Sequence, residues 1–530
     1  MNATWWRPVL TVAVFSLLPF AVFVNDNRAY LDPGAILGPF VLVLLLLGLA
    51  ALVIADRLGG PVTRERAAVV FAAAAFVLFQ FRFARSLAEL LGLDADLVVV
   101  ATWLVLFAAA VVLAIRLSRH ALAWNYAAVA GALLLALPVV QFAFFKATTP
   151  APDLSASALP VQLSSPPEQP PDVYFFLLDG YGRADQLERT IGFDNDPFLD
   201  ELRRRGFEVQ DEATAAYPVT FLSLASTLSM DYPAEPGQLD DYIPFFDAVG
   251  GDNEVVEAFH RLGYQFAFAS DYSSFECGSQ VDLCIEPSRE GIEGVDGEKE
   301  VAILGATPLA TLLPALGIHF SSLDGYLSPE GVVSEVARER SEEPLFTYAH
   351  MLTPHPPYRY LEGCELREDL TDPGIDDWGV ASEAGGEQYG QSVECVNRAL
   401  LRAIDEIEAE NPNAIIVIQG DHGPKFDIDF QRPLSEWSQQ QLDSRFAILN
   451  AQRLPARCAS GGARAALAVN TFRLILGCIS GQALSLLPGR ELMINLEAGE
   501  VEEVCDQVGE TLGFLFELGG EEARLDRIFL

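Results

Sequence analysis

The sequence predicts a protein in two parts, a bundle of about five transmembrane helices followed by a water-soluble domain of the α/β class. Three observations lead to this fold class. Long apolar stretches crowd into the part of the 530-residue chain before residue 146, a Pro/Ser-rich segment follows them, and beyond it short apolar runs alternate with stretches of helical periodicity. We therefore expect a transmembrane domain over residues 1–146, a linker over 147–171 and a soluble domain over 172–530.

Five apolar stretches are each close to the roughly 20 residues that cross the hydrocarbon core of a bilayer. They cover residues 9–24, 36–54, 67–81, 97–115 and 122–145. If all five cross the membrane, the loops on the side of the N-terminus hold Arg7, Arg57, Arg64, Arg66, Arg116 and Arg119, and those on the other side hold Arg28, Arg82 and Arg85. Because positively charged loops stay in the cytoplasm, we expect a multi-pass protein of the plasma (inner) membrane whose soluble, catalytic domain is extracytoplasmic.

The charge and the cysteines bear on the partners and the compartment of the chain. The net charge of −39 belongs mainly to the soluble part and would repel nucleic acid, so we expect no nucleic-acid partner. All seven cysteines also lie in the soluble part, which favours an oxidising compartment, with Cys277–Cys284 and Cys364–Cys395 as candidate disulfides. The odd number leaves at least one thiol unpaired, and reduced, buried cysteines are the alternative.

Five short apolar runs in the soluble part are the candidate strands of a buried sheet. Four of them end at Asp179, Ser270, His422 and Ala451, and the fifth surrounds His350. Helix candidates such as residues 197–205 and 396–408 lie between them. Three of the runs thus bring a polar side chain to the carboxyl end of a strand, the edge at which open α/β sheets place their sites.

The strongest local motif is Gly420-Asp421-His422-Gly423, where a carboxylate and an imidazole stand side by side at the end of a buried strand. The glycines are expected to let the backbone turn sharply and approach a ligand. Asp179, at the end of another strand, completes an oxygen and nitrogen site for a divalent metal ion, with Zn²⁺ or Mn²⁺ favoured and Mg²⁺ or Ca²⁺ as alternatives. Taken singly, each motif also fits an ordinary turn with a capping Asp.

Thr220 is the candidate nucleophile. Pro218 should precede an amphipathic helix, which places Thr220 in the first turn, where the helix dipole favours negative charge. A hydroxyl there that also contacts a metal would lose its proton more readily. The alternative role is an ordinary Thr N-cap. The rival hydroxyls of this segment are Ser223, Ser226, Thr227 and Ser229.

His350 and His355 stand in YAHMLTPHPPYRY, a strand that runs into a proline-stiffened loop. A histidine at such an edge can donate a hydrogen bond to a phosphate oxygen or protonate a leaving group. The alternative for a loop histidine is a solvated surface position. Five histidines fall in the soluble part and three of them stand in the two strand-end motifs, so we take His350 and His355 as candidate catalytic residues.

The ordered motifs LLDGYGR, YPVTFLSLAST, HMLTPHPPY and GDHG resemble those of the alkaline phosphatase/sulfatase superfamily, in the membrane branch that includes lipoteichoic acid synthases and lipid A phosphoethanolamine transferases. The resemblance spans roughly residues 172–487. It implies an α/β/α sandwich of the alkaline phosphatase type, with Asp179, Thr220, Asp421 and His422 as metal ligands and Thr220 as the covalent nucleophile. It also implies that His355 contacts the substrate phosphate, with His350 as a neighbour.

The chain departs from this family pattern in three places. Sulfatases proper carry a Cys or Ser in C/S-x-P-x-R that becomes formylglycine, and the segment that begins at Thr220 has no such motif, which favours phosphorus over sulfate chemistry. Two-zinc members usually have a further histidine beyond the DHG motif, and none follows His422, so we expect one metal ion. The synthases often carry Glu where Asp179 stands, so their substrate does not transfer to this chain.

These observations predict a membrane-anchored, metal-dependent phosphoryl-group transferase or phosphodiester hydrolase. Its expected partners are membrane lipids and a lipid or cell-envelope glycan phosphoester as substrate. Two alternatives belong to other classes. A catalytically inactive module that senses glycans or lipid headgroups should have lost one of the four ligands, and a transporter should have acidic residues or broken helices within the membrane, which the apolar stretches lack.

Overall fold

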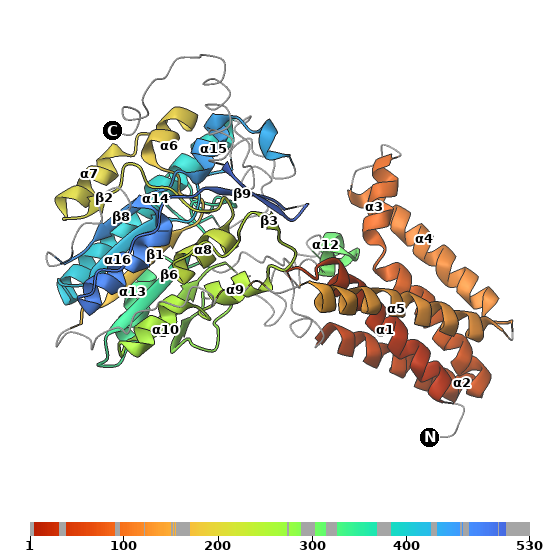
Figure 1. Cartoon of the computed structure of the whole chain (residues 1–530). Helices are drawn as coiled ribbons and strands as arrows, with labels where there is room; N and C mark the ends of the chain where they lie inside the picture. Colours follow the sequence, from red (N-terminus) through yellow and green to blue (C-terminus); the bar gives the residue numbers. More distant parts are fainter. Residues whose placement is uncertain are drawn as a thin grey trace, which may run out of the picture. The chain divides into compact units, whose positions relative to one another are not determined.

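The computed structural model describes residues 5–30, 39–90, 96–120, 122–149, 170–272, 275–287, 303–313, 326–367, 383–425, 432–455, 466–496 and 498–504, together with 152, 154 and 458. The chain forms two compact units (Figure 1). The helical unit comprises residues 1–151, 241–243 and 289–324, and the α/β unit comprises the rest. Most of the predicted linker, residues 155–169, lies outside the described residues.

The described residues before the linker form five helices of the helical unit. They are α1 (Trp6–Asp26), α2 (Pro39–Leu78), α3 (Phe81–Leu90), α4 (Asp96–Leu117) and α5 (Ala123–Thr148). Within the described residues, α1, α2, α4 and α5 are long and apolar enough to cross a membrane. The chain is therefore a membrane protein by the length and composition of these helices.

Helix α2 is folded back on itself at Gly60, whose positive φ of 72° interrupts the helical backbone. A Cβ atom placed on Gly48 would come within 2.9 Å of the Phe71 ring, although a straight helix would separate these residues by about 35 Å. Arg64 likewise reaches across the bend to Asp56, with 2.7 Å between Nη1 and Oδ1. The two halves of α2 carry most of the second and third predicted apolar stretches, so the five predicted stretches correspond to four long apolar helices among the described residues.

The α/β unit is built on a seven-stranded sheet in the order β2-β8-β7-β1-β6-β4-β5. Its strands are β1 (Val173–Leu178), β2 (Glu208–Val209), β4 (Gln265–Ser270), β5 (Leu283–Ile285), β6 (Leu345–Met351), β7 (Ile415–Gly420) and β8 (Asn450–Arg453). The five strands from β7 to β5 are parallel to one another. Strand β8 pairs with β7 in the antiparallel sense, and β2 in turn pairs with β8 in the antiparallel sense. The carboxyl ends of the five parallel strands therefore meet at one edge.

Helices cover both faces of this sheet (Figure 1). One face packs against α6 (Ala184–Ile191), α7 (Asp196–Arg204), α13 (Pro329–Glu339) and α14 (Glu383–Glu410), and the other against α8 (Thr220–Ser229), α10 (Glu254–Arg261) and α16 (Thr471–Ser480). Along β1, Tyr174, Phe176 and Leu178 point into the first core, while Val173, Phe175 and Leu177 point into the second. Strand β1 is fully buried because both its faces are covered, and the α/β/α fold class is confirmed.

The remaining elements are short. They are α9 (Ile243–Val249), α12 (Leu309–Leu312), α15 (Gln439–Phe446), the 3₁₀ turns Leu434–Glu436 and Ala468–Asn470, and a second sheet in the order β3 (Gly237–Gln238), β10 (Glu500–Glu503) and β9 (Leu492–Asn495).

One predicted strand is misplaced. The apolar run that ends at Ala451 was expected to be a strand throughout, but Phe446 still belongs to α15 and β8 begins only at Asn450. Helix α15 starts at a capping box in which Ser438 and Gln441 bond reciprocally, and it continues into the apolar run. Periodicity does not distinguish a helix end from a strand in so short a run.

Both predicted disulfides are present in the α/β unit. Cys277 pairs with Cys284 and Cys364 pairs with Cys395, and a third pair that was not predicted joins Cys458 to Cys478. The remaining cysteine, Cys505, lies outside the described residues.

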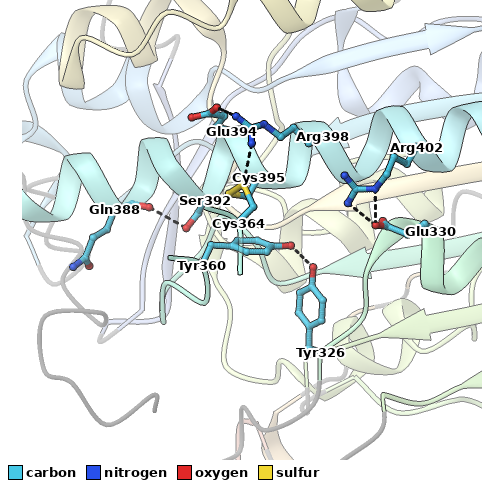
Figure 2. The surroundings of a disulfide bond; sticks show 10 residues. All are labelled: Tyr326, Glu330, Tyr360, Cys364, Gln388, Ser392, Glu394, Cys395, Arg398 and Arg402. Atoms are coloured by element: carbon cyan, nitrogen blue, oxygen red, sulfur yellow. Dashed lines mark hydrogen bonds and ion pairs between the residues drawn. A yellow bond between two sulfur atoms is a disulfide. The ribbon is translucent and has the colours of Figure 1, made fainter. Parts of the chain in front are cut away.

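The Cys364–Cys395 disulfide fastens the segment that follows β6 to helix α14 (Figure 2). Next to it, the hydroxyl groups of Tyr326 and Tyr360 are hydrogen-bonded to each other. Arg402 of α14 donates to the Glu330 carboxylate of α13, at 2.6 Å from Nη2 to Oε1. The segment after β6, which carries His355, is thus tied covalently to a long helix.

Candidate metal centre and nucleophile

Strand register brings the predicted ligands together. Strands β1 and β7 are neighbours, with Leu178 paired to Gly420, so Asp179 and Asp421 leave the sheet side by side. His422 follows directly, and β6 flanks β1 on its other side. All these residues lie at the carboxyl edge that the sequence predicts for the site.

Asp179, Asp421 and His422 form a buried cluster that could hold a metal ion. One ligand atom from each lies within 4.8 Å of the others. The His422 Nε2 atom is 3.2 Å from Asp421 Oδ2 and 3.7 Å from Asp179 Oδ1. The three side chains are at most 2% exposed, so the cluster is shielded from bulk water.

Two carboxylate oxygens of the cluster lack a hydrogen-bond donor. Asp421 Oδ1 accepts from the backbone N–H groups of Gly180 and His422, each at 2.8 Å, but Asp421 Oδ2 and Asp179 Oδ1 have no hydrogen-bond partner in the described part of the chain. Leaving a buried acceptor unsatisfied costs about 1–3 kcal/mol. Oxygens of this kind, aimed at an imidazole nitrogen, fit a divalent cation of the zinc or manganese type.

The tautomer of His422 suits a metal ligand. Its Nδ1 atom lies 3.1 Å from the carbonyl oxygen of Gly423. Because a carbonyl only accepts, Nδ1 carries the proton and Nε2 keeps its lone pair. Burial lowers the pKa of His422 well below its ordinary value, with the charge of Arg445 adding to the effect, so the neutral imidazole is favoured.

The Thr220 hydroxyl faces this lone pair. Thr220 Oγ1 is 3.0 Å from His422 Nε2, and the threonine is half-buried as the first residue of α8. The N-cap position belongs to Val219, and no side chain caps the helix. The alternative role of Thr220 as an N-cap is therefore wrong, and its hydroxyl points to the cluster instead.

The rival hydroxyls of α8 are bound elsewhere. Ser223 Oγ donates to the carbonyl oxygen of Asp421 at 2.5 Å, and Thr227 Oγ1 donates to that of Ser223 at 3.0 Å. Ser226 and Ser229 also donate to backbone carbonyls. Within the described segment, Thr220 alone presents its hydroxyl to the cluster.

A comparison with protein families identifies the soluble part. Residues 183–445 match the family model described as Sulfatase. These residues form a Sulfatase-family domain, in agreement with the predicted resemblance to the alkaline phosphatase/sulfatase superfamily. The matched range includes Thr220, both candidate catalytic histidines and the Asp421-His422 pair, and it begins four residues after Asp179.

Solved structures with this superfamily fold resemble the chain at low identity. The lipooligosaccharide phosphoethanolamine transferase EptA of Neisseria meningitidis is 13% identical, with a TM-score of 0.38, over 89% of this chain and 95% of that one. The periplasmic domain of EptC from Escherichia coli is 11% identical over 65% of this chain and 97% of that one, with a TM-score of 0.35.

A third structure, BT4656 with its substrate D-glucosamine-2-N,6-O-disulfate, is 12% identical over 60% of this chain and 78% of that one, with a TM-score of 0.37. No curated protein matches the chain by sequence. At these identities the structural likeness carries no inference about activity.

The two candidate catalytic histidines differ in burial and in their contacts. His350 is fully buried in β6, with its Nε2 atom 3.6 Å from Asp179 Oδ2 and no hydrogen-bond partner for that atom among the described residues. His355 is half-buried in the turn after β6, and its Nδ1 atom bonds to the carbonyl of Pro356. The charge of His355 opposes the rise that burial causes in the pKa of Asp179, and His350 Nε2 faces the Oδ2 atom of the same carboxylate.

Arg445 is a site residue that the sequence did not reveal. It is 4% exposed, and its Nε atom donates to the carbonyl of Pro218 at 2.6 Å, while Nη1 donates to the carbonyl of Gly423. The backbone N–H of Gly423 donates in return to the Arg445 carbonyl at 2.8 Å. One guanidinium thus joins the segment before Thr220 to the segment after His422.

Asp271, also missed, holds the segment that leads to His355. It follows β4 and is buried, and its Oδ1 atom accepts from the backbone N–H of Leu352 at 2.6 Å. A single acidic residue after a strand gave no signal that separated it from an ordinary turn residue.

The glycines of the DHG motif allow other backbone segments to approach closely. A Cβ atom at Gly420 would collide with the backbone carbonyl of Tyr181, and one at Gly423 would collide with that of Ser444. Neither glycine has a positive φ. They permit close packing of backbone against backbone, and the chain bends at Asp421 and His422 between them.

Replacing Arg445 with methionine should weaken zinc binding by about 10- to 100-fold, because the donors that fix both ligand segments are lost. Zinc affinity is measured by competition with a chromophoric chelator. Arg473 offers a matched control, since its guanidinium also donates to two backbone carbonyls, those of Met230 and Ser485, at 2.9 Å each. Equal affinities in Arg445→Met and Arg473→Met would contradict this role.

Zinc affinity should rise with pH through neutrality. Burial raises the pKa of both Asp179 and Asp421, and the charge of Asp179 raises that of Asp421 further, so metal must displace protons from these carboxyl groups as it binds. Each displaced proton contributes about a tenfold change per pH unit. The same competition titration, repeated across the neutral range, should show a shallower slope for Asp421→Asn, and an affinity independent of pH would contradict the carboxyl assignment.

Proposed function

We propose that the chain is a membrane-anchored, metal-dependent phosphoryl-group transferase or phosphodiester hydrolase that acts on lipid or cell-envelope glycan phosphoesters. One observation carries the proposal. The Thr220 hydroxyl, at the start of helix α8, lies 3.0 Å from the unprotonated nitrogen of His422 within a buried cluster of Asp and His.

A divalent cation held by Asp179, Asp421, His422 and Thr220 would supply Lewis acidity that lowers the pKa of the hydroxyl and offsets charge on the phosphoryl oxygens. The match to the Sulfatase family and the two orphaned carboxylate oxygens support one such ion. Zinc or manganese suits the mixed oxygen and nitrogen donors.

The proposed reaction proceeds in two displacement steps at phosphorus. In the first, Thr220 Oγ1 gives up its proton and forms a bond to phosphorus while the bond to the leaving oxygen breaks. In the second, an acceptor hydroxyl or water attacks the phospho-threonine and releases Thr220. The first-turn N–H groups and the dipole of α8 favour the negative charge that accumulates.

His355 is proposed to move the protons. Burial lowers its pKa, and the bond from Nδ1 to Pro356 holds its proton on that nitrogen, so Nε2 receives a proton before it gives one. It takes up the proton that Thr220 Oγ1 releases and passes it to the leaving oxygen. His350, whose Nε2 atom faces Asp179, positions that carboxylate.

Phosphorus chemistry is favoured over sulfate ester hydrolysis by the nucleophile itself. A threonine carries a methyl group on Cβ and cannot be converted to formylglycine, and the surrounding residues lack the C/S-x-P-x-R pattern. The three disulfides of the α/β unit support an extracytoplasmic catalytic domain, because disulfides persist in oxidising compartments.

The proposal is tested with the purified full-length protein by metal analysis and a phosphodiester substrate screen. We expect one zinc or manganese ion per chain and turnover of at least one lipid-like phosphodiester that a chelator abolishes. Bound headgroup or glycan without metal and without turnover would establish an inactive sensor module instead.

A further inference from the structure

The helical unit contains an apolar groove that the enzymatic site does not use. Its volume is about 880 Å³, close to that of pockets that hold drug-sized ligands. It is lined by α1, the second half of α2, the end of α4 and the start of α5. Helices α4 and α5 follow one another in the chain yet hardly pack together, and Figure 1 shows them diverging from their connection. The groove lies in this gap.

Small side chains keep the groove open. Seven of its lining residues are alanines: Ala72, Ala73, Ala110, Ala114, Ala123, Ala127 and Ala130. Of the sixteen lining residues, only His120 and Tyr126 carry polar side-chain atoms. Water in such a groove would find few partners, so an apolar ligand fills it at lower cost.

The length of the groove matches one leaflet of a bilayer. Along α5 it extends from Leu122 to Leu134, which is about 18 Å at the helical rise. Half of a hydrocarbon core is about 15 Å thick. The two polar lining residues lie near the Leu122 end, so the groove has a polar mouth and an apolar floor, as an acyl chain below its headgroup requires.

The mouth opens at the arginine-rich end of the helical unit. The Arg64 guanidinium lies over the Trp5 ring at 4.1 Å, and the Trp6 and Trp124 rings are 6.2 Å apart, so the bend of α2 and the starts of α1 and α5 share this end. Its charged residues in the described part are Arg7, Arg57, Arg64, Arg66, Arg116, Arg119, Asp56 and Glu65. The excess of positive charge favours an anionic headgroup.

We propose that this groove binds one acyl chain of an anionic glycerophospholipid, whose headgroup lies against Arg116, Arg119 and His120. The positive-inside rule places this end in the cytoplasmic leaflet. The site is thus separate from the catalytic chemistry, and the inference does not depend on the proposed function.

The test counts the lipids that the full-length protein retains. The protein is purified in a mild detergent, incubated with equal amounts of phosphatidylglycerol and phosphatidylethanolamine, and analysed by native mass spectrometry. We expect one phosphatidylglycerol per chain in the wild type. Ala130→Trp fills the groove from α5 and should lose this lipid, whereas Ala136→Trp, at an exposed position of the same helix outside the groove, should retain it.

Two further variants keep the result interpretable. Ala73→Trp fills the groove from α2 and should also lose the lipid, which covers the case that Ala130→Trp does not fold. The double variant Arg116→Gln and Arg119→Gln should retain a lipid but lose the preference for phosphatidylglycerol. Retention of the lipid by a folded groove-filling variant, or no retention by the wild type, would overturn the site. Equal retention of both lipids by the wild type would overturn the anionic headgroup.

Discussion

Replacing Thr220 with alanine should reduce turnover by roughly 10³-fold or more, because the nucleophile of both displacements is removed. The fold should survive, since the hydroxyl bonds to the cluster side chains His422 and Asp179 and the threonine is half-buried. Turnover of a phosphodiester and the thermal unfolding midpoint are the two measurements.

Thr227→Ala is the matched control for this variant. Thr227 lies on the same helix, two turns further along, and its hydroxyl donates to the Ser223 carbonyl. It should lose some stability and keep its activity. An active Thr220→Ala enzyme would show that the nucleophile is assigned to the wrong residue.

The second large effect concerns Asp421. Asparagine at this position keeps an oxygen that can accept from the N–H groups of Gly180 and His422 but replaces the orphaned Oδ2 with an amide NH₂ group. An NH₂ group does not ligate a cation, so Asp421→Asn should lower metal affinity by more than about 100-fold and abolish turnover. Zinc affinity by chelator competition and metal content after dialysis measure this loss.

Asp172 offers a control at the opposite edge of the sheet. It directly precedes β1, is 3% exposed, and accepts from the backbone N–H of Leu345 at 2.9 Å and from the amide of Asn411 at 3.0 Å. Asp172→Asn should destabilise the fold without changing metal affinity. If Asp421→Asn and Asp172→Asn bound metal equally well, the cluster would not be the metal centre.

The sequence was sufficient to place the predicted metal ligands at the carboxyl edge of the sheet. Asp179 and Asp421 each follow an apolar run that is too short for a helix between two turns, and such runs form parallel strands in an α/β sheet. Parallel strands bring their carboxyl ends together, so the proximity of the Asp179 and Asp421 carboxylates, which lie far apart in the sequence, follows from the fold class. Strand order and register, which pair Leu178 with Gly420, were not predictable from local patterns.

Arg445 was not predictable because its partners are backbone carbonyls. Every residue has a carbonyl, so no pattern in the sequence marks Pro218 or Gly423 as an acceptor for a guanidinium. The same holds for the DHG glycines, whose role depends on the approach of Tyr181 and Ser444 backbone atoms from other segments.

The helical unit illustrates the opposite case, in which sequence patterns give the elements but not their packing. The apolar stretches were recognisable from composition, and Gly60 is an evident helix breaker. Two features depend on which helix faces meet. The Phe71 ring packs against Gly48, and alanines leave a groove between α4 and α5. A hydrophobic pattern that is nearly uniform around a transmembrane helix does not specify those faces.

The most direct test of the central claim is mass spectrometry of the full-length protein after brief incubation with bacterial lipids and a divalent metal, followed by peptide mapping. The account predicts a phosphoryl-type adduct on Thr220, absent from Thr220→Ala and from chelator-treated protein, whose mass identifies the transferred group. Turnover accompanied by an adduct on another residue, or turnover with no adduct on Thr220 under conditions that trap the intermediate, would contradict it.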